Sequence, residues 1–297
     1  MELIGIDLGG TKIEGVAIDP ARPGEALARI RRPTEQERGY EHILEQIAAI
    51  VEELRSRYPE AVPALGIGTP GTLDARTGAL RGSNTQCLNG RPIKADLEAR
   101  LGMRVEIEND ANCFALAEAT LGAARGCETV FGIILGTGVG GGIVIRERIL
   151  HGHHGIAGEW GQIVIEPEGP VSAYGTRGTV EACLSGPGLE RFYASRSGLK
   201  RSLKEIVEQE AEDAAARETL ERMEEVFVKA IALVINCLDP DAIVVGGGVG
   251  NIGRFYSERM RERIGEAIFA PKFEAALLKP ALGDSAGVFG AAMLTRE

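Results

Sequence analysis

The segment Asp7–Lys12 combines residue types that can bind a phosphate group with a metal ion beside it. Two consecutive glycines allow a tight turn whose backbone N–H groups can surround an anion. Thr11 adds a hydroxyl donor, Lys12 adds a positive charge, and Asp7 can position a hydrated Mg²⁺ ion. A plain hairpin turn needs none of these side chains, so we interpret the segment as a phosphate-binding turn. Its candidate residues are Asp7, Gly9, Gly10, Thr11 and Lys12.

A second glycine-rich turn, Gly136–Gly142, lies between two expected strands. It contains the spacing G-x-G-x-x-G, which in dinucleotide-binding proteins leads directly into a helix. Here the strand-like stretch Ile143–Ile145 follows instead. We therefore interpret this turn as a second phosphate site rather than a dinucleotide site, with Gly136, Thr137 and Gly138 as its candidate residues.

A third glycine cluster, Gly246–Gly248, follows the expected strand Ala242–Val245. The stretch Gly248–Gly253 again has the spacing G-x-G-x-x-G, and a helix is expected over Ile252–Ile264. A nicotinamide site also needs an acidic residue at the end of the next strand, and Ala275–Leu278 has none. We favour close approach of this backbone to an adenine and its ribose, with Gly246, Gly247 and Gly248 as candidates.

Asp110 lies in a polar run that follows an expected strand and begins an expected helix. Helix capping is the ordinary explanation for such residues, and one cap contributes about 1 kcal/mol. One cap suffices, yet three residues of Asn109–Asn112 are of capping type. An aspartate here could accept a proton from a hydroxyl that attacks a phosphate. Asp110 is therefore a candidate general base, an interpretation that depends on the family resemblance described below.

The composition narrows the class of protein. The chain has 297 residues, 44% of them hydrophobic, which is enough for two modest domains with buried cores. Its formal net charge of −10 opposes binding to nucleic acid or to anionic membrane surfaces. The longest uncharged run, Thr129–Ile145, is broken by glycines and is shorter than a membrane span. Five scattered cysteines without a C-x-x-C pair favour a reducing cytoplasm, as does a start without a signal-peptide pattern.

The hydrophobic patterns predict the elements that must position these turns. Apolar residues at helical spacing predict a helix over Tyr40–Arg57, and three strands precede it, so we expect a mixed α/β sheet with a leading hairpin. We expect a smaller domain of residues 1–121 plus 285–297 and a larger one of residues 122–284, with a hinge near Asn109–Gly122. The other expected strands are Leu3–Asp7, Lys12–Asp19, Leu27–Arg32, Val62–Gly68, Val105–Glu108, Val130–Leu135 and Gly142–Ile145; the other expected helices are Ile93–Leu101, Asn109–Leu121, one around Leu220–Val234, and Ala286–Leu294.

Several segments together resemble the ROK family of sugar kinases, which have the actin-like, hexokinase-type ATPase fold. The resemblance runs in order along almost the whole chain, so it is more specific than any single turn. It implies a two-domain actin-like (ribonuclease H-like) α/β fold that holds nucleotide and sugar in the cleft between the domains. The segments that carry it are Asp7–Lys12, Gly66–Gly71, Asn109–Cys113, Gly136–Gly142, Ala157–Gly161 and Leu238–Asp241 with Gly246–Gly248.

The resemblance also assigns roles to single residues. Asp110 matches the catalytic base, and Asp7, which is interpreted above as holding Mg²⁺ through water, lies in the segment that matches the first phosphate segment. The two phosphate turns and the third glycine cluster match the segments that bind ATP. Asn84, Asn109, Glu159 and Glu181 match positions that hydrogen-bond the sugar hydroxyls. Further candidate contacts to the sugar are Gly68, Asp110 and Gln162.

The resemblance implies an ATP-dependent hexose kinase that phosphorylates the 6-hydroxyl of fructose, mannose or glucose. The segment Asn84–Gly90 is similar to the fructokinase and mannokinase type. Asn112–Leu116 and Leu135–Gly142 are as similar to N-acetylglucosamine kinases, so N-acetylglucosamine or N-acetylmannosamine is the alternative substrate. A sugar-binding regulator without catalysis is a remote alternative; a repressor is disfavoured because the first expected strand begins at Leu3. A cytoplasmic homodimer with a small-molecule sugar substrate is expected.

The segment Gly158–Ala182 departs from the family pattern. Family members typically have a histidine and three cysteines there, which bind a structural Zn²⁺. None of the matching residues is imidazole or thiolate, the ligands that zinc prefers, so zinc is not expected. We expect packing and hydrogen bonds to hold the segment, with Tyr174 filling volume. The matching residues are Gln162, Ser172, Tyr174 and Thr179; the nearby His151, His153 and His154 are interpreted as an exposed or sugar-contacting loop.

Overall fold

The computed structural model describes residues 1–74 and 76–296. The chain forms two compact units. The first contains Met1–Gly126, Glu147–Ala157 and Pro280–Glu297, and the second contains Cys127–Arg146 and Gly158–Lys279. The domain boundaries expected after residues 121 and 284 stay a prediction. Within the described residues, no helix is long and apolar enough to cross a membrane.

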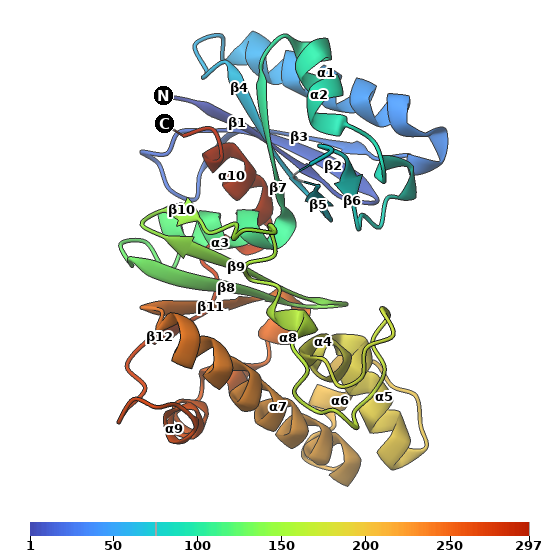
Figure 1. The fold of residues 1–297 in the computed structure, drawn as a ribbon, viewed down its shortest axis with the longest axis vertical. Helices are drawn as coiled ribbons and strands as arrows, with labels where there is room; N and C mark the ends of the chain where they lie inside the picture. Colours follow the sequence, from blue (N-terminus) through green and yellow to red (C-terminus); the bar gives the residue numbers. More distant parts are fainter. Residues whose placement is uncertain (75, 297) are drawn as a thin grey trace. The chain divides into compact units, whose positions relative to one another are not determined.

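The first unit is built on a five-stranded sheet in the order β3-β2-β1-β4-β7 (Figure 1). Strands β1 and β2 form the expected leading hairpin, and β2 pairs antiparallel with β3. Strands β1, β4 and β7 are parallel, so their carboxyl ends meet at one edge of the sheet. The strands are β1 (Leu3–Leu8), β2 (Lys12–Ile18), β3 (Ala26–Pro33), β4 (Ala64–Thr69) and β7 (Arg104–Asn109).

Helices cover both faces of this sheet (Figure 1). A Cβ atom on Gly15 would lie 2.3 Å from a methyl carbon of Ile50, so α1 packs tightly on one face. On the other face, a Cβ atom on Gly66 would lie 1.7 Å from the carbonyl oxygen of Ala291 in α10. Only glycine permits this approach. The elements are α1 (Tyr40–Arg57), α2 (Ile93–Leu101), α3 (Asp110–Thr120), α10 (Ala286–Met293), the short strands β5 (Thr72–Leu73), β6 (Leu80–Arg81) and β10 (Arg148–Ile149), and the 3-10 turns η1 (Gln36–Arg38), η2 (Gln86–Leu88) and η5 (Gly283–Ser285).

The second unit contains a sheet in which β9, β8, β11 and β12 are successive neighbours. Strands β8 and β9 are antiparallel, whereas β8, β11 and β12 are parallel. Its core includes Trp160, whose ring meets Phe131 and Phe227 edge to face. The elements are β8 (Thr129–Leu135), β9 (Val139–Ile145), β11 (Ala242–Gly246), β12 (Ala276–Leu278), α4 (Val180–Leu184), α5 (Gly186–Ser197), α6 (Leu203–Glu208), α7 (Ala214–Leu238), α8 (Gly247–Gly250), α9 (Glu258–Ala267), η3 (Trp160–Gln162) and η4 (Gly253–Tyr256).

The mixed α/β class is confirmed, and α1 and α2 have the expected bounds. Two expectations are wrong. The helix expected over Ile252–Ile264 is interrupted, because Ser257 is extended and its side chain caps α9 by accepting the Met260 N–H at 3.2 Å. Strand β9 begins at Val139 rather than Gly142, because its glycines pair with β8 along the whole turn.

Replacing Gly66 by alanine is expected to destabilise the first unit. The new methyl group would overlap the α10 backbone, which cannot move as a flexible side chain can, and overpacking of this kind costs roughly 1–3 kcal/mol or more. The midpoint of thermal unfolding should fall by several degrees. Gly253→Ala is the control, since nothing lies within 4 Å of its Cβ position. Equal midpoints for the two variants would contradict this account of the packing.

Candidate functional site

The parallel strands of the first unit bring four predicted residues to one edge of the sheet: Asp7, Gly68, Asn109 and Asp110. Asp7 pairs with Gly68, and Gly68 pairs with Glu108. The next pair along the same strands joins Thr69 to Asn109. Asp110 follows Asn109 directly as the first residue of α3. Local sequence placed each residue at a strand end, and the sheet register places them side by side.

The first glycine turn is closed by backbone and side-chain hydrogen bonds. The Gly9 N–H donates to the Lys12 carbonyl at 3.0 Å. Thr34 supports the turn, since its hydroxyl donates to the Gly9 carbonyl at 2.7 Å and its N–H donates to the Thr11 carbonyl at 3.0 Å. Thr11 and Lys12 are exposed. The turn therefore keeps a hydroxyl and an ammonium group available to a ligand.

A buried carboxylate below this turn was not identified from the sequence. Glu14 is only 2% exposed and accepts hydrogen bonds from Arg29 at 2.5 Å and Arg31 at 2.7 Å, while Lys12 lies 3.3 Å away. Burial alone would raise the pKa of Glu14, but the hydrogen bond from Arg31 and the charges of Arg29, Arg31 and Lys12 lower it. The pairing register of β2 with β3 could have identified Glu14, because it places Glu14 directly opposite Arg31. Glu14 thus anchors Lys12 beside the turn.

Asp110 lies at the N-terminus of α3, where the helix dipole favours negative charge. The Ala111 N–H donates to the Asp110 carboxylate and to the Asn109 side chain, each at 2.8 Å. Desolvation raises the pKa of Asp110 in spite of this hydrogen bond. Desolvation, followed by the charges of Asp110 and Glu14, raises the pKa of Asp7 to about 6. A carboxyl group tuned toward neutral pH is suited to accept a proton.

Glu108 adds a polar network next to Asp110. Its carboxylate accepts the side-chain N–H of Asn112 at 2.9 Å and also bonds to the His151 imidazole. The hydrogen bond to Glu108 raises the pKa of His151. The histidine loop was expected to be exposed or to contact the sugar; His151 is 58% exposed, and it also contacts Glu108 at the end of β7. Apart from its place at the end of an expected strand, nothing in the sequence indicated that Glu108 would join this network.

The second glycine turn is bound by Glu181, a residue that the sequence assigned only to the sugar. The Glu181 carboxylate accepts the Val139 N–H at 3.1 Å. A Cβ atom on Gly138 would lie 2.9 Å from the same carboxylate oxygen. The Gly186 N–H donates to the Gly136 carbonyl at 2.8 Å and closes the other side of the turn. Thr137 remains exposed at its tip.

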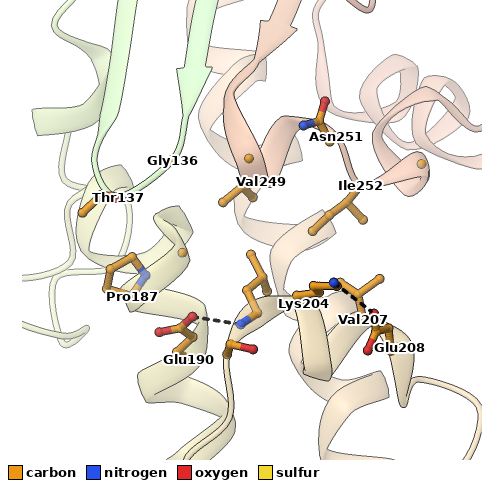
Figure 2. Close-up of a pocket in the computed structure, with 15 residues that line it drawn as sticks. Gly136, Thr137, Pro187, Glu190, Lys204, Val207, Glu208, Val249, Asn251 and Ile252 are labelled. Carbon is orange, nitrogen blue, oxygen red and sulfur yellow. Dashed lines mark hydrogen bonds and ion pairs between the residues drawn. The ribbon is translucent and has the colours of Figure 1, made fainter. Parts of the chain in front are cut away.

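A pocket of about 910 Å³ opens beside this turn (Figure 2). Gly136, Thr137 and Gly248 line it, whereas Gly138, Gly246 and Gly247 are not part of its wall. The volume suits a nucleoside. Its remaining side chains come from α5, α6 and the stretch after β11, which sequence patterns did not connect. Apolar lining is provided by Leu203, Val207, Val249 and Ile252, and charged groups by Glu190, Lys204 and Glu208.

The segment without zinc ligands is held by hydrogen bonds. The Ser172 hydroxyl accepts the N–H groups of Tyr174 and Thr176, each at 3.3 Å, and buried Thr179 caps α4 by accepting the Ala182 N–H at 3.2 Å. The expectation for Tyr174 is wrong, because its side chain is 75% exposed and fills no internal volume. Among residues 1–74 and 76–296, no group of three or more His, Cys, Asp or Glu residues could hold a metal ion.

The residues of the second unit that were expected to contact the sugar lie in two segments. Glu159 precedes η3 and Gln162 ends it, and the Trp160 indole N–H fixes this turn by donating to the Gly140 carbonyl at 3.0 Å. Glu181 lies on α4. In the first unit, Asn84 is exposed on a loop that Asn89 closes by bonding to the Ser83 backbone at 2.9 Å.

A sequence profile described as the ROK family matches residues 3–297. The chain belongs to the ROK family. Its relatives include the glucokinase of Thermotoga maritima, which is 33% identical over 100% of this chain and 98% of that protein. The N-acetyl-D-glucosamine kinase of Vibrio cholerae is 34% identical over 98% of each chain.

Solved structures of ROK proteins share the fold. The ROK hexokinase from Thermus thermophilus superposes with a TM-score of 0.89, at 34% identity over 99% of this chain and 97% of that one. A ROK family glucokinase from Streptomyces griseus, in complex with glucose and AMPPNP, gives a TM-score of 0.76 at 30% identity over 100% and 99%. The actin-like ATPase fold expected from the sequence is confirmed. The cleft between domains stays a prediction.

Replacing Asp7 by asparagine is expected to stabilise this ROK protein above pH 6. The folded-state pKa of about 6 exceeds the ordinary value of 3.8, so the unfolded chain loses its proton first as the pH rises. Stability is therefore lost between about pH 4 and pH 6, by an amount on the order of 3 kcal/mol. Asp7→Asn removes this loss.

The measurement is the free energy of unfolding in urea at pH 4 and pH 8. The gain should be complete at pH 8 and much smaller at pH 4, because at the lower pH Asp7 is protonated in the folded protein and only about half ionised in the unfolded chain. Asp239→Asn, at an exposed position after α7, is the matched control for the exchange of a carboxylate for an amide. A gain of equal size at both pH values would contradict the assignment of a raised pKa to Asp7.

Proposed function

We propose that this chain is an ATP-dependent sugar kinase in which Asp110 deprotonates the 6-hydroxyl of a hexose as that oxygen attacks the γ-phosphate. One observation carries the proposal: Asp110, with its raised pKa, begins α3 at the sheet edge that also holds Asp7 and the first glycine turn. Full-length matches to kinases named for glucose and N-acetylglucosamine support the reaction class.

The reaction assigns distinct tasks to the residues of each unit. In the first unit, Asp110 accepts the proton of the sugar hydroxyl while the new oxygen–phosphorus bond forms and ADP leaves. The N-terminus of α3 offsets the cost of a charged carboxylate at that position. The N–H groups and hydroxyl of Asp7–Lys12 bind phosphoryl oxygens. In the second unit, the turn Gly136–Gly138 does the same for the donor phosphates.

Mg²⁺ fits the donor set near Asp7. Magnesium in phosphoryl-transfer enzymes is held by one or two carboxylates, with phosphates and water completing the octahedron. Asp7 and Asp110 offer hard oxygen ligands, and the pKa of each is raised. Part of the rise in the pKa of Asp7 comes from the charge of Asp110, so a cation near the two carboxylates would be favourable. When bound, the ion neutralises charge on the transferred phosphoryl group. Asp7 would hold it through water.

The sugar contacts are proposed at Gly68, Asn84, Asn109, Glu159, Gln162 and Glu181, in addition to Asp110. Carboxylates and amides suit this task because each sugar hydroxyl both donates and accepts a hydrogen bond. The apolar pocket beside Gly136 would take the adenosine part of ATP. A cytoplasmic location, a homodimer and the finer assignment to fructose are further parts of the proposal.

N-acetylglucosamine is the second candidate substrate. Its support is specific, since the N-acetyl-D-glucosamine kinase of Vibrio parahaemolyticus is 35% identical over 98% of this chain, against 33% for the Thermotoga glucokinase. N-acetylmannosamine belongs to the same class of acceptor. A sugar-binding protein without catalysis is the remaining alternative.

A panel of acceptors tests the proposal directly. ADP release is measured with Mg²⁺-ATP and fructose, mannose, glucose, N-acetylglucosamine or N-acetylmannosamine, with a zinc chelator present. We expect turnover of at least one sugar, and undiminished turnover in the chelator because residues 162–179 contain neither histidine nor cysteine. Binding of a sugar without turnover of any would contradict the kinase proposal and favour the non-catalytic alternative.

Replacing Asp110 by asparagine is expected to lower kcat by roughly 10²–10⁴-fold, the usual contribution of a general base. The amide keeps the shape and the hydrogen bond from Ala111, so the sugar should still bind within a few-fold of its normal Kd, as measured by calorimetry. Glu106→Gln is the control, because it removes a carboxylate of β7, the strand that precedes Asp110, and this carboxylate pairs with Lys94. Near-normal turnover by the Asp110 variant would remove Asp110 from the role of base.

A further inference from the structure

The segment Ile163–Thr179 has little regular structure, yet a side chain anchors it to the helices of the second unit. Within the segment, backbone pairing is limited to isolated bridges such as Val164 with Thr179. Glu166, 19% exposed, forms an ion pair with Arg222 of α7. Burial raises the pKa of the neighbouring Cys183 thiol to about 11, and this neutral thiol lies 3.7 Å from the same Glu166 oxygen. The Glu166 carboxylate thus joins the segment to α7 and α4.

Arg222 is itself held in place. Its side chain is 23% exposed, and its guanidinium lies 4.8 Å over the ring of Phe192 on α5. Stacking of this kind fixes the plane of the guanidinium and reduces the entropy lost on pairing. A partly buried, stacked pair is also less screened by solvent than an exposed one. The anchor is therefore rigid enough to transmit position.

The backbone around Glu166 leads directly to α4. The Glu166 N–H donates to the Gly178 carbonyl at 3.1 Å. Gly178 has a φ of 66°, and a Cβ atom there would lie 1.5 Å from the Glu166 carbonyl oxygen. The next residue, Thr179, caps α4, and Glu181 follows in its first turn. A shift of Glu166 would therefore move the start of α4 and the Glu181 carboxylate.

We propose that the Glu166–Arg222 ion pair positions Glu181, so that its carboxylate is presented to a sugar hydroxyl while it holds the Val139 N–H of the second glycine turn. The ion pair does this in a chain whose residues at 162, 172, 174 and 179 are not metal ligands. The inference rests on the proposed function, which assigns Glu181 to the sugar. Glu166 and Arg222 act through Glu181 and are positioning residues.

Glu166→Gln tests the inference, because it removes the charge and keeps the shape. We expect the KM for the sugar and its calorimetric Kd to rise about tenfold, which corresponds to about 1.4 kcal/mol, with kcat at saturating sugar changed less than about twofold. Arg222→Lys keeps the ion pair and should retain most of the sugar affinity of the unmodified protein. The double variant Glu166→Gln/Arg222→Gln should bind sugar no worse than Glu166→Gln alone, since both changes remove one interaction.

Glu218→Gln is the matched control. Glu218 on α7 pairs with Arg196 on α5 at 3.0 Å, and Arg196 lies 5.0 Å over the same Phe192 ring. This pair joins the same two helices without contacting the segment, so its loss should leave sugar affinity unchanged. Thermal unfolding of all variants separates a general loss of stability from a loss of positioning.

Glu181→Gln makes the possible failures distinguishable. If Glu181→Gln weakens sugar binding and Glu166→Gln does not, even though Glu166→Gln lowers the unfolding midpoint, the pair is only structural and the inference is wrong. If neither variant changes sugar affinity, Glu181 has no sugar role and the inference is wrong with it. Absence of turnover in the unmodified protein, with sugar binding intact, counts against the proposed kinase function alone, because affinity still tests the positioning.

Discussion

The desolvation of Asp7 and Asp110 at one edge of the first sheet is the constraint on which this unit depends. Ionising each carboxyl group requires more free energy here than in water, and for Asp7 the charge of Asp110 raises that free energy further. The fold keeps them there through the parallel register of β1, β4 and β7 and through the helix that starts at Asp110. Two desolvated carboxyl groups at one place destabilise the fold when they are ionised. Binding of a cation or transfer of a proton to one of them would relieve this destabilisation, as is common at functional sites.

Glycine makes this edge possible from behind. The last helix, α10, lies against β1 and β4 so closely that Gly5 and Gly66 have no room for a side chain. Gly290 of the same helix meets the Cys113 carbonyl of α3, where its own Cβ atom would lie 1.8 Å away. A C-terminal segment therefore supports both the strand that carries Asp7 and the helix that carries Asp110. Close backbone packing leaves these elements little freedom to shift, which suits residues that must hold their geometry.

In the second unit, the irregular segment Ile163–Thr179 is held in place without histidine or cysteine ligands to a metal. Hydrogen bonds from Ser172 and Thr179 form its turns, and Glu166 ties it to α7 through Arg222. Glu181, at the end of the segment, bonds to the second glycine turn. The turn that lines the pocket at Gly136 and Thr137 and the helix that carries Glu181 are thus parts of one hydrogen-bonded unit. Changes in one are expected to reach the other through Glu181.

Sequence alone determined what depends on neighbours along the chain. Helical periodicity predicted the helix Tyr40–Arg57 with the bounds that the structure shows. The glycine turns and the polar run at Asp110 could be identified because their residue types act on the backbone next to them. Tertiary structure decided what depends on pairs far apart in sequence: the partners of Glu14 on β3, the contact of His151 with Glu108, the pocket walls from α5 and α6, and the ion pair of Glu166 with Arg222. Such pairs produce no periodic pattern in the sequence. A single charged residue on a loop or strand is therefore expected to be solvent-exposed, and its partner is known only once the fold is known.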